Sequence, residues 1–194
     1  MTVAAPLRLE ARAVRGTRVG MRARRPLPGP VLLAGVAGAV APGIRPGDLV
    51  VADRVLAGGT EHLLPGAAQL AGALRRAGLT VHVGPVAGVN RIVTGGSRQA
   101  YAAAGALAVD MESGVLAARL SAVVRAIVDT PDHPLLRPGT VRRGIAALRA
   151  LRRAAPILLA WDAAGDPGEV RVRAGRAAHP DNSTRLPGKV EESP

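Results

Sequence analysis

The sequence predicts an α/β protein, a single domain with a central mixed sheet flanked by helices. Short apolar runs that suit buried strands alternate along the chain with longer segments of helical spacing. The length of 194 residues lies in the range of one domain and allows a sizeable core. Because the chain has no Phe and only one Trp and one Tyr, that core must consist of Leu, Val, Ile and Ala.

The N-terminal part of the chain predicts a short strand and then a strand, loop, strand unit. Residues 2–6 form a poor first strand, because a proline interrupts it. Residues 31–34 are a continuous apolar run followed by Gly35 and Gly38, which predicts a buried strand that enters a glycine-rich loop. After an Arg-Pro-Gly turn, residues 48–53 form the next strand candidate.

A helix and a strand follow. Residues 65–77 begin with a proline, place Leu70 and Leu74 on one face and stop at Gly78, as is typical of a helix. Residues 80–86 alternate in polarity and suit a strand.

The remaining core elements are expected between residues 97 and 128. Ser97 predicts the N-cap of a helix that runs to about Leu107. Residues 108–109 and 122–128 are candidates for buried strands, with a helical stretch over 111–120 between them.

An amphipathic helix is predicted over 138–154, because apolar and basic residues separate onto two faces. The apolar face comprises Val141, Ile145, Leu148 and Leu151, and the basic face comprises Arg142, Arg149 and Arg153. The pattern favours a surface helix docked on the sheet. Peripheral contact of this helix with a membrane surface is the alternative.

The domain is expected to span residues 1–164. From Gly165 the chain turns polar and rich in Pro and Gly, and it has no periodicity after Val172. Residues 165–194 are therefore expected to form a polar, disordered C-terminal tail.

The formal charge of +12 would ordinarily suggest a nucleic-acid or anionic-membrane partner. Lys189 is the only lysine, however, so the excess of Arg is typical of a biased base composition. The chain also has almost no aromatic side chains on which bases could stack. We therefore expect no nucleic-acid partner.

Composition also argues against metals and secretion. The chain has no Cys, and its four histidines are scattered without metal-ligand spacing, so no metal is expected. The N-terminus does not resemble a secretory signal, and the longest uncharged run, residues 26–44, is broken by prolines and glycines. We expect a soluble, cytoplasmic protein.

Four segments resemble the signature segments of one family. Val109 to Ser113 resembles the A-x-E/D-M-E-S signature of the nucleoside phosphorylase and nucleosidase family, and Arg125 to Asp129 resembles its R-x-I-S-D strand. Upstream, residues 35–40 and 47–53 resemble the family's G-x-A-G-G-L and G-D-L-V-V-A-D segments, in the family's order and spacing. The resemblance implies cleavage of a purine N-glycosidic bond, which requires an acid that protonates the base, a carboxylate that holds the ribose hydroxyls and an activated nucleophile.

The resemblance implies a role for each site residue. Asp129 would protonate the purine, and Glu112 would hold the ribose hydroxyls. Met111 would pack against the nucleoside. The pocket wall would include the residues of the glycine segment, Gly35, Ala37 and Gly38.

The start of the chain points to a subgroup. Pro6 to Arg12 is similar to the A-L-R-L-E-A-R start of the hopanoid-associated phosphorylases, which are assigned to the release of adenine from an adenosylated hopane. In that position Glu10 would order or activate water. The resemblance implies a purine nucleoside as substrate, no cofactor and a homo-oligomer, with phosphate as a possible co-substrate.

Two departures from the family pattern bear on activity. The region between Glu10 and the glycine segment is shorter than in the family. The alternative to an enzyme is therefore a catalytically inactive relative that retains the fold as a binding or scaffold protein. Phosphorylases of the family carry an Arg and a Ser where this chain has Leu33 and Val36, which favours hydrolysis over phosphorolysis. Three arginines, Arg22, Arg24 and Arg25, could replace the missing phosphate ligands.

Overall fold

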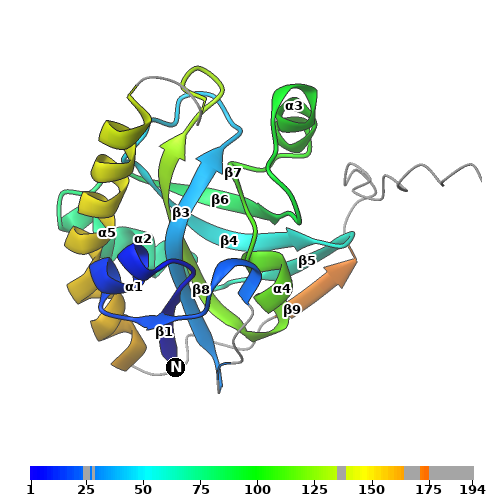
Figure 1. Cartoon of the computed structure of the whole chain (residues 1–194). Helices are drawn as coiled ribbons and strands as arrows, with labels where there is room; N and C mark the ends of the chain where they lie inside the picture. Colours follow the sequence, from blue (N-terminus) through cyan, green and yellow to red (C-terminus); the bar gives the residue numbers. More distant parts are fainter. Residues whose placement is uncertain (24–26, 28, 135–138, 164–170, 175–194) are drawn as a thin grey trace, which may run out of the picture.

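The computed structural model describes residues 1–23, 27, 29–134, 139–163 and 171–174, and these form an α/β domain around one mixed sheet (Figure 1). The strands of the described chain are β1 Thr2–Ala5, β2 Thr17–Arg18, β3 Val31–Ala39, β4 Leu49–Ala57, β5 Thr60–Leu63, β6 Val81–Gly88, β7 Ala108–Asp110, β8 Leu120–Asp129 and β9 Arg171–Ala174. The predicted fold class is confirmed.

Five of these strands close on themselves. β3 pairs with β7 and β8, β4 pairs with β6 and β8, and β6 pairs with β7. One core cluster consists of side chains that these strands contribute on the same side, among them Leu33, Val50, Val86, Ala108 and Ile127. The sheet therefore encloses an apolar core of its own instead of lying flat between helix layers.

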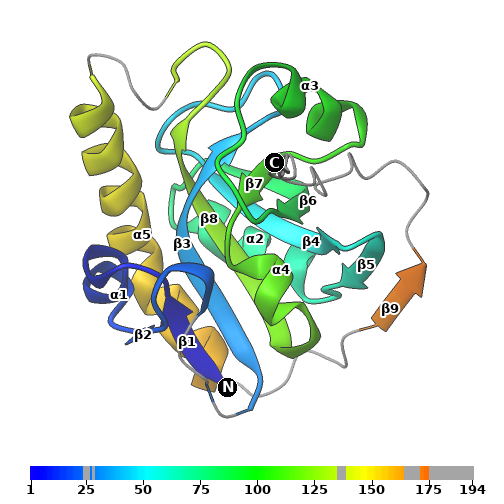
Figure 2. The same cartoon turned by 45° about the vertical axis from the view of Figure 1, so that its right-hand side comes forward.

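Three helices cover the opposite side of the sheet, as Figures 1 and 2 show: α1 Arg8–Val14, α2 Ala67–Arg76 and α5 Thr140–Ala163. They contribute Ala11, Leu70, Leu74, Leu151 and Leu158 to the other large core cluster. The shorter helices are α3 Gly95–Ala103, α4 Ser113–Leu116, η1 Met21–Ala23 and η2 Ala117–Arg119. In α3, Thr94 is the N-cap residue and Ser97 lies inside the helix, so the predicted cap was wrong.

The predicted glycine-rich loop is wrong. Gly35 and Gly38 lie inside β3, which continues to Ala39. A Cβ atom on residue 35 would lie 2.5 Å from Arg125 Nη1, and one on residue 38 would lie 2.9 Å from Asp129 Oδ1. These glycines are needed because charged side chains of the neighbouring strand β8 occupy the space of a side chain, and not because the backbone turns.

The buried face of α5 differs from the predicted one. Leu148 and Leu151 pack on the core as expected, but Val141 and Ile145 are exposed on the solvent side. The buried stripe consists of Ala147, Ala150, Leu151, Ala154, Ala155 and Leu158. The small alanine side chains allow the helix to pack close to the sheet. The buried face therefore differs from the face that the larger apolar residues predicted.

The C-terminal part contains one unexpected strand. Residues 171–174, within the expected disordered tail, form β9 and pair antiparallel with β5. Backbone hydrogen bonds to an open sheet edge can order a segment that has no hydrophobic periodicity of its own. Residues 164–170 and 175–194 lie outside the described residues, so the rest of the expected tail stays a prediction.

None of the helices in the described chain is long and apolar enough to cross a membrane. The expected cytoplasmic location stays a prediction. The segment between α1 and β3 holds only β2 and η1 among its described residues, in keeping with the expected shortening near the N-terminus.

Candidate active site

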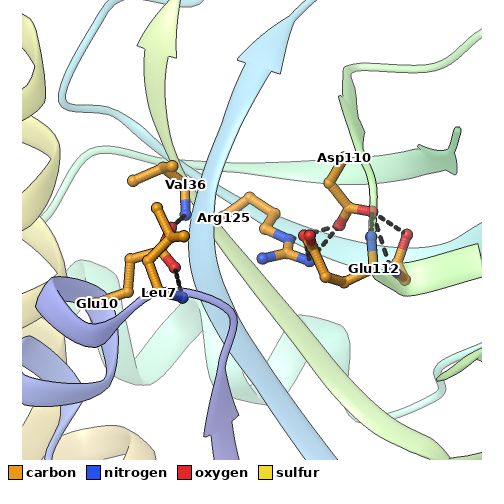
Figure 3. Close-up of polar contacts among 7 residues, drawn as sticks. Leu7, Glu10, Val36, Asp110, Glu112 and Arg125 are labelled. Carbon is orange, nitrogen blue, oxygen red and sulfur yellow. Dashed lines mark hydrogen bonds and ion pairs between the residues drawn. The ribbon is translucent and has the colours of Figure 1, made fainter. Parts of the chain in front are cut away.

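A buried arginine lies at the centre of the candidate site. Arg125 stands between Val123 and Ile127 on β8, in a row of side chains that otherwise pack in the apolar core, and its side chain is 0% exposed. A guanidinium in such a place requires carboxylate partners, because an unpaired buried charge is strongly destabilising. Figure 3 shows carboxylates on both sides of it.

Asp110 and Glu112 supply the negative charge on one side. Arg125 Nε donates to Asp110 Oδ2 at 2.5 Å, and Arg125 Nη2 lies 3.6 Å from Glu112 Oε2. The other oxygen of Asp110 accepts hydrogen bonds from the Ser113 amide at 2.8 Å and its hydroxyl at 2.6 Å. Asp110 therefore orients both the arginine and the turn from β7 into α4, and this turn carries Glu112.

Glu10 lies on the other side of Arg125. It is only 2% exposed, and its two oxygens accept hydrogen bonds from the amides of Leu7 at 2.6 Å and Val36 at 2.8 Å. Burial raises the pKa of the Glu10 carboxyl above its usual value, while the two amide hydrogen bonds and the Arg125 guanidinium oppose that shift. The result is a carboxylate held in one orientation and able to accept a proton.

The missing side chain of Gly35 brings these groups together. A Cβ atom there would lie 2.5 Å from Arg125 Nη1 and 3.3 Å from Glu10 Oε1, so both atoms border the same small space. Arg125 Nη1 is buried, and no group of the described residues accepts a hydrogen bond from it. A buried donor beside a carboxylate suits a water molecule or a substrate hydroxyl that bonds to both.

Asp129 lies at the end of β8 and is paired with an arginine from another element. Arg98 of α3 donates through Nη2 to Asp129 Oδ2, and the two side chains are 12% and 10% exposed. Gly38 leaves room for both, since a Cβ atom there would lie 3.0 Å from Arg98 Nη2. In this structure Asp129 Oδ2 is therefore hydrogen-bonded to the guanidinium of Arg98.

The remaining predicted site residues lie nearby with different exposure. Met111 follows Asp110 and packs, partly buried, on a small cluster around Val89 and Tyr101. The Ala37 methyl packs in the core enclosed by the strands, so its contact with a substrate would have to be through the backbone. Leu33 lies in the same core.

Sequence reasoning missed the pairing roles of Arg125, Asp110 and Arg98. An arginine inside an otherwise apolar strand was the available signal for Arg125, since such a residue is almost never buried without a partner. No local signal marks Arg98, which lies on a helix 31 residues before its partner.

Two observations bear on ligands other than a nucleoside. No three His, Asp or Glu residues gather as a metal-binding group in the described part of the chain. Leu33 is a core side chain and Val36 presents its backbone amide to Glu10, so neither position offers the phosphate ligands of a phosphorylase. Arg24 and Arg25 lie outside the described residues, as does the side chain of Arg22.

Solved structures with the same fold are nucleosidases and a related hydrolase. A 5'-methylthioadenosine/S-adenosylhomocysteine nucleosidase from Helicobacter pylori, in complex with butyl-thio-DADMe-Immucillin-A, aligns with a TM-score of 0.64 and 13% identity over 84% of this chain and 97% of that one. A futalosine hydrolase from the same organism aligns with a TM-score of 0.65 and 14% identity over 84% of this chain and 98% of that one. A putative nucleosidase from Francisella philomiragia aligns with a TM-score of 0.63 and 14% identity over 83% of this chain and 97% of that one. These similarities establish the shared fold.

The sequence itself shows the family. Residues 27–123, half of the chain, match the model of the phosphorylase superfamily, and the chain belongs to that superfamily. The predicted family of nucleoside phosphorylases and nucleosidases is thereby confirmed, and with it the class of enzyme. No curated protein matches the chain, and the hopanoid-associated subgroup stays a prediction.

Proposed function

We propose that this protein hydrolyses the N-glycosidic bond of a purine nucleoside, with water as the nucleophile. The observation that carries the proposal is the pair formed by the buried Glu10 carboxylate and the buried, unpartnered Arg125 Nη1 on either side of Gly35. The solved relatives include enzymes named for hydrolysis or for nucleosidase activity, which supports the same reaction.

In the proposed reaction Glu10 acts as the general base. Arg125 Nη1 donates to the oxygen of a water molecule and Glu10 Oε1 accepts one of its protons, so the oxygen is aimed and activated. The water oxygen forms a bond to the anomeric carbon of ribose as the bond to the purine nitrogen breaks. The electron pair of that bond leaves with the base.

Asp129 is the proposed acid that transfers a proton to the departing purine. For that step we expect Arg98 to withdraw from Asp129 Oδ2, because an ionised carboxylate that is paired with a guanidinium only accepts hydrogen bonds and has no proton to donate. Asp129 gives its proton to the purine and is reprotonated by solvent after the base leaves, and Glu10 returns to solvent the proton that it took from water. This exchange would make Arg98 a positioning residue for Asp129.

Glu112 is the proposed ligand of the ribose hydroxyls. Its carboxylate lies close to Arg125, and the Asp110 and Ser113 contacts hold the turn on which it stands. Because an ionised carboxylate is only an acceptor, it suits two neighbouring hydroxyl donors. Met111, beside it, would contact the nucleoside, and the backbone of Gly35, Ala37 and Gly38 would form the wall.

The finer identity of the substrate rests on the resemblance of the N-terminus. It favours adenine release from an adenosylated hopane, without a cofactor and in a homo-oligomer. Water is favoured over phosphate because Leu33 and Val36 cannot hold phosphate through their side chains.

The reaction can be tested by product analysis. We expect the purified protein to release the free base from a purine nucleoside, with adenosylated substrates as the first to be tried, at the same rate with and without phosphate. The sugar product should be the free sugar. A sugar phosphate formed only with phosphate present would replace hydrolysis by phosphorolysis, and the absence of base release from every purine nucleoside tried would favour the inactive binding or scaffold protein.

The pH dependence tests Glu10 separately. Glu10 must be ionised to accept a proton, so kcat/KM should fall as the pH decreases through the raised Glu10 pKa, above the usual value of 4.5. The free energy of unfolding should depend on pH in the opposite direction from that of a protein with a salt-bridged carboxylate. The folded protein binds the Glu10 proton more tightly than the unfolded chain, so the free energy of unfolding decreases as the pH rises through this range.

A pH profile of kcat/KM measures this limb, and Glu10→Gln should remove most of the activity at every pH. A profile with an acid limb at or below 4.5, or a fully active Glu10→Gln variant, would exclude Glu10 as the base.

A further inference from the structure

Exposed arginines are concentrated on the helix layer of α1, α2 and α5. They are Arg8, Arg12, Arg15, Arg75, Arg76, Arg142, Arg149, Arg152 and Arg153, the third of these being the C-cap residue of α1. In the rest of the described chain only Arg45, Arg91 and Arg119 are exposed arginines. Most of the exposed arginines that the structure describes therefore lie in this helix layer.

The described side chains of these helices include no exposed carboxylate that would balance this charge. Among the side chains that the structure describes on the three helices, only Glu10 is acidic, and it lies on the buried face of α1. The three helices also form one surface. Arg153 Nη2 on α5 donates to the carbonyls of Ala77 and Gly78 at the end of α2, at 3.1 and 3.2 Å, and α1 lies beside α5 (Figure 1).

Large apolar side chains are exposed on two of these helices. Leu9 at the start of α1 is 65% exposed, and Val141 and Ile145 at the start of α5 are 77% and 43% exposed. On α5 these two share the solvent face with Arg149 and Arg152 at helical spacing. Basic and aliphatic residues are thus mixed on the outer side of helices that already pack on the core through their other side.

We propose that this helix layer binds the anionic phospholipid headgroups of a membrane surface, with Leu9, Val141 and Ile145 entering the headgroup region. Guanidinium groups attract anionic lipid, and exposed aliphatic side chains among them add apolar burial. A nucleic acid would match the charge but leave the aliphatic side chains without a partner, which favours lipid. The inference does not depend on the proposed hydrolysis, and each can fail without the other.

Sedimentation with vesicles tests the surface. We expect the full chain to bind vesicles of phosphatidylcholine mixed with phosphatidylglycerol, to bind pure phosphatidylcholine much more weakly, and to lose affinity as salt increases. The double variant Arg149→Gln and Arg152→Gln should bind the anionic vesicles roughly tenfold or more weakly, since each charge near the surface contributes substantially.

The matched control removes the same charge elsewhere. The double variant Arg45→Gln and Arg91→Gln should retain the affinity of the unchanged protein, which separates a localised surface from net charge. Equal losses in the two variants, equal binding to both kinds of vesicle, or no binding would overturn the proposal. Tighter binding to a DNA duplex that is weakened by the Arg149 and Arg152 changes would assign the surface to nucleic acid and also overturn it.

Discussion

Replacing Asp129 by Asn is expected to lower the turnover number for a purine nucleoside by about 10²- to 10⁴-fold, the usual contribution of general acid catalysis. Asparagine can donate a hydrogen bond to the base but has no proton to transfer. Asn also removes the charge that pairs with Arg98. The side chains are nearly equal in size, so the fold should be retained, which circular dichroism and thermal unfolding can check.

Glu112→Gln is the matched comparison within the site. Loss of one acceptor oxygen should raise KM as well as lower turnover, because the proposed partners of Glu112 are ribose hydroxyls present before the reaction. Steady-state kinetics of the two variants on one nucleoside would distinguish acid catalysis from sugar binding. Two well-folded variants with the unchanged protein's rate would mean that neither carboxylate acts in the site.

The second large effect concerns stability. Replacing Arg125 by Met keeps much of the volume but leaves Asp110 and Glu112 buried without their cation. Breaking a buried ion pair by removing one partner typically costs about 3–5 kcal/mol, so the free energy of unfolding should fall by that amount. Urea denaturation measures the difference.

Arg153→Met provides the control for this experiment. Arg153 is exposed and, among the described residues, donates to two carbonyls at the end of α2, so its loss should change the free energy of unfolding by about 1 kcal/mol. If Arg125→Met is as stable as this control, Arg125 does not hold the site together. If Arg125→Met keeps its full stability but loses activity, Arg125 acts on the attacking water and does not stabilise the fold.

Much of the element order was predictable because it depends on local pattern. Apolar runs predicted β4 and β8, alternating polarity predicted β6, and the Pro start and Gly stop predicted α2. Prediction was wrong at Gly35 and Gly38, because glycine is typical both of loops and of close approach inside a strand. It was also wrong for Val141 and Ile145, because helical spacing says which residues share a face but not which face meets the sheet.

The sequence by itself determined the family and predicted the segments that we propose to carry its chemistry, since both depend on short motifs in a fixed order. Only the tertiary structure decided how the charges pair. Glu10 bonds to an amide 26 residues away, and Arg98 reaches Asp129 across 31 residues. Such contacts are set by which strands lie side by side and by the space that two glycines leave between them. Local periodicity does not carry that information, because a buried charge finds its partner through packing in three dimensions.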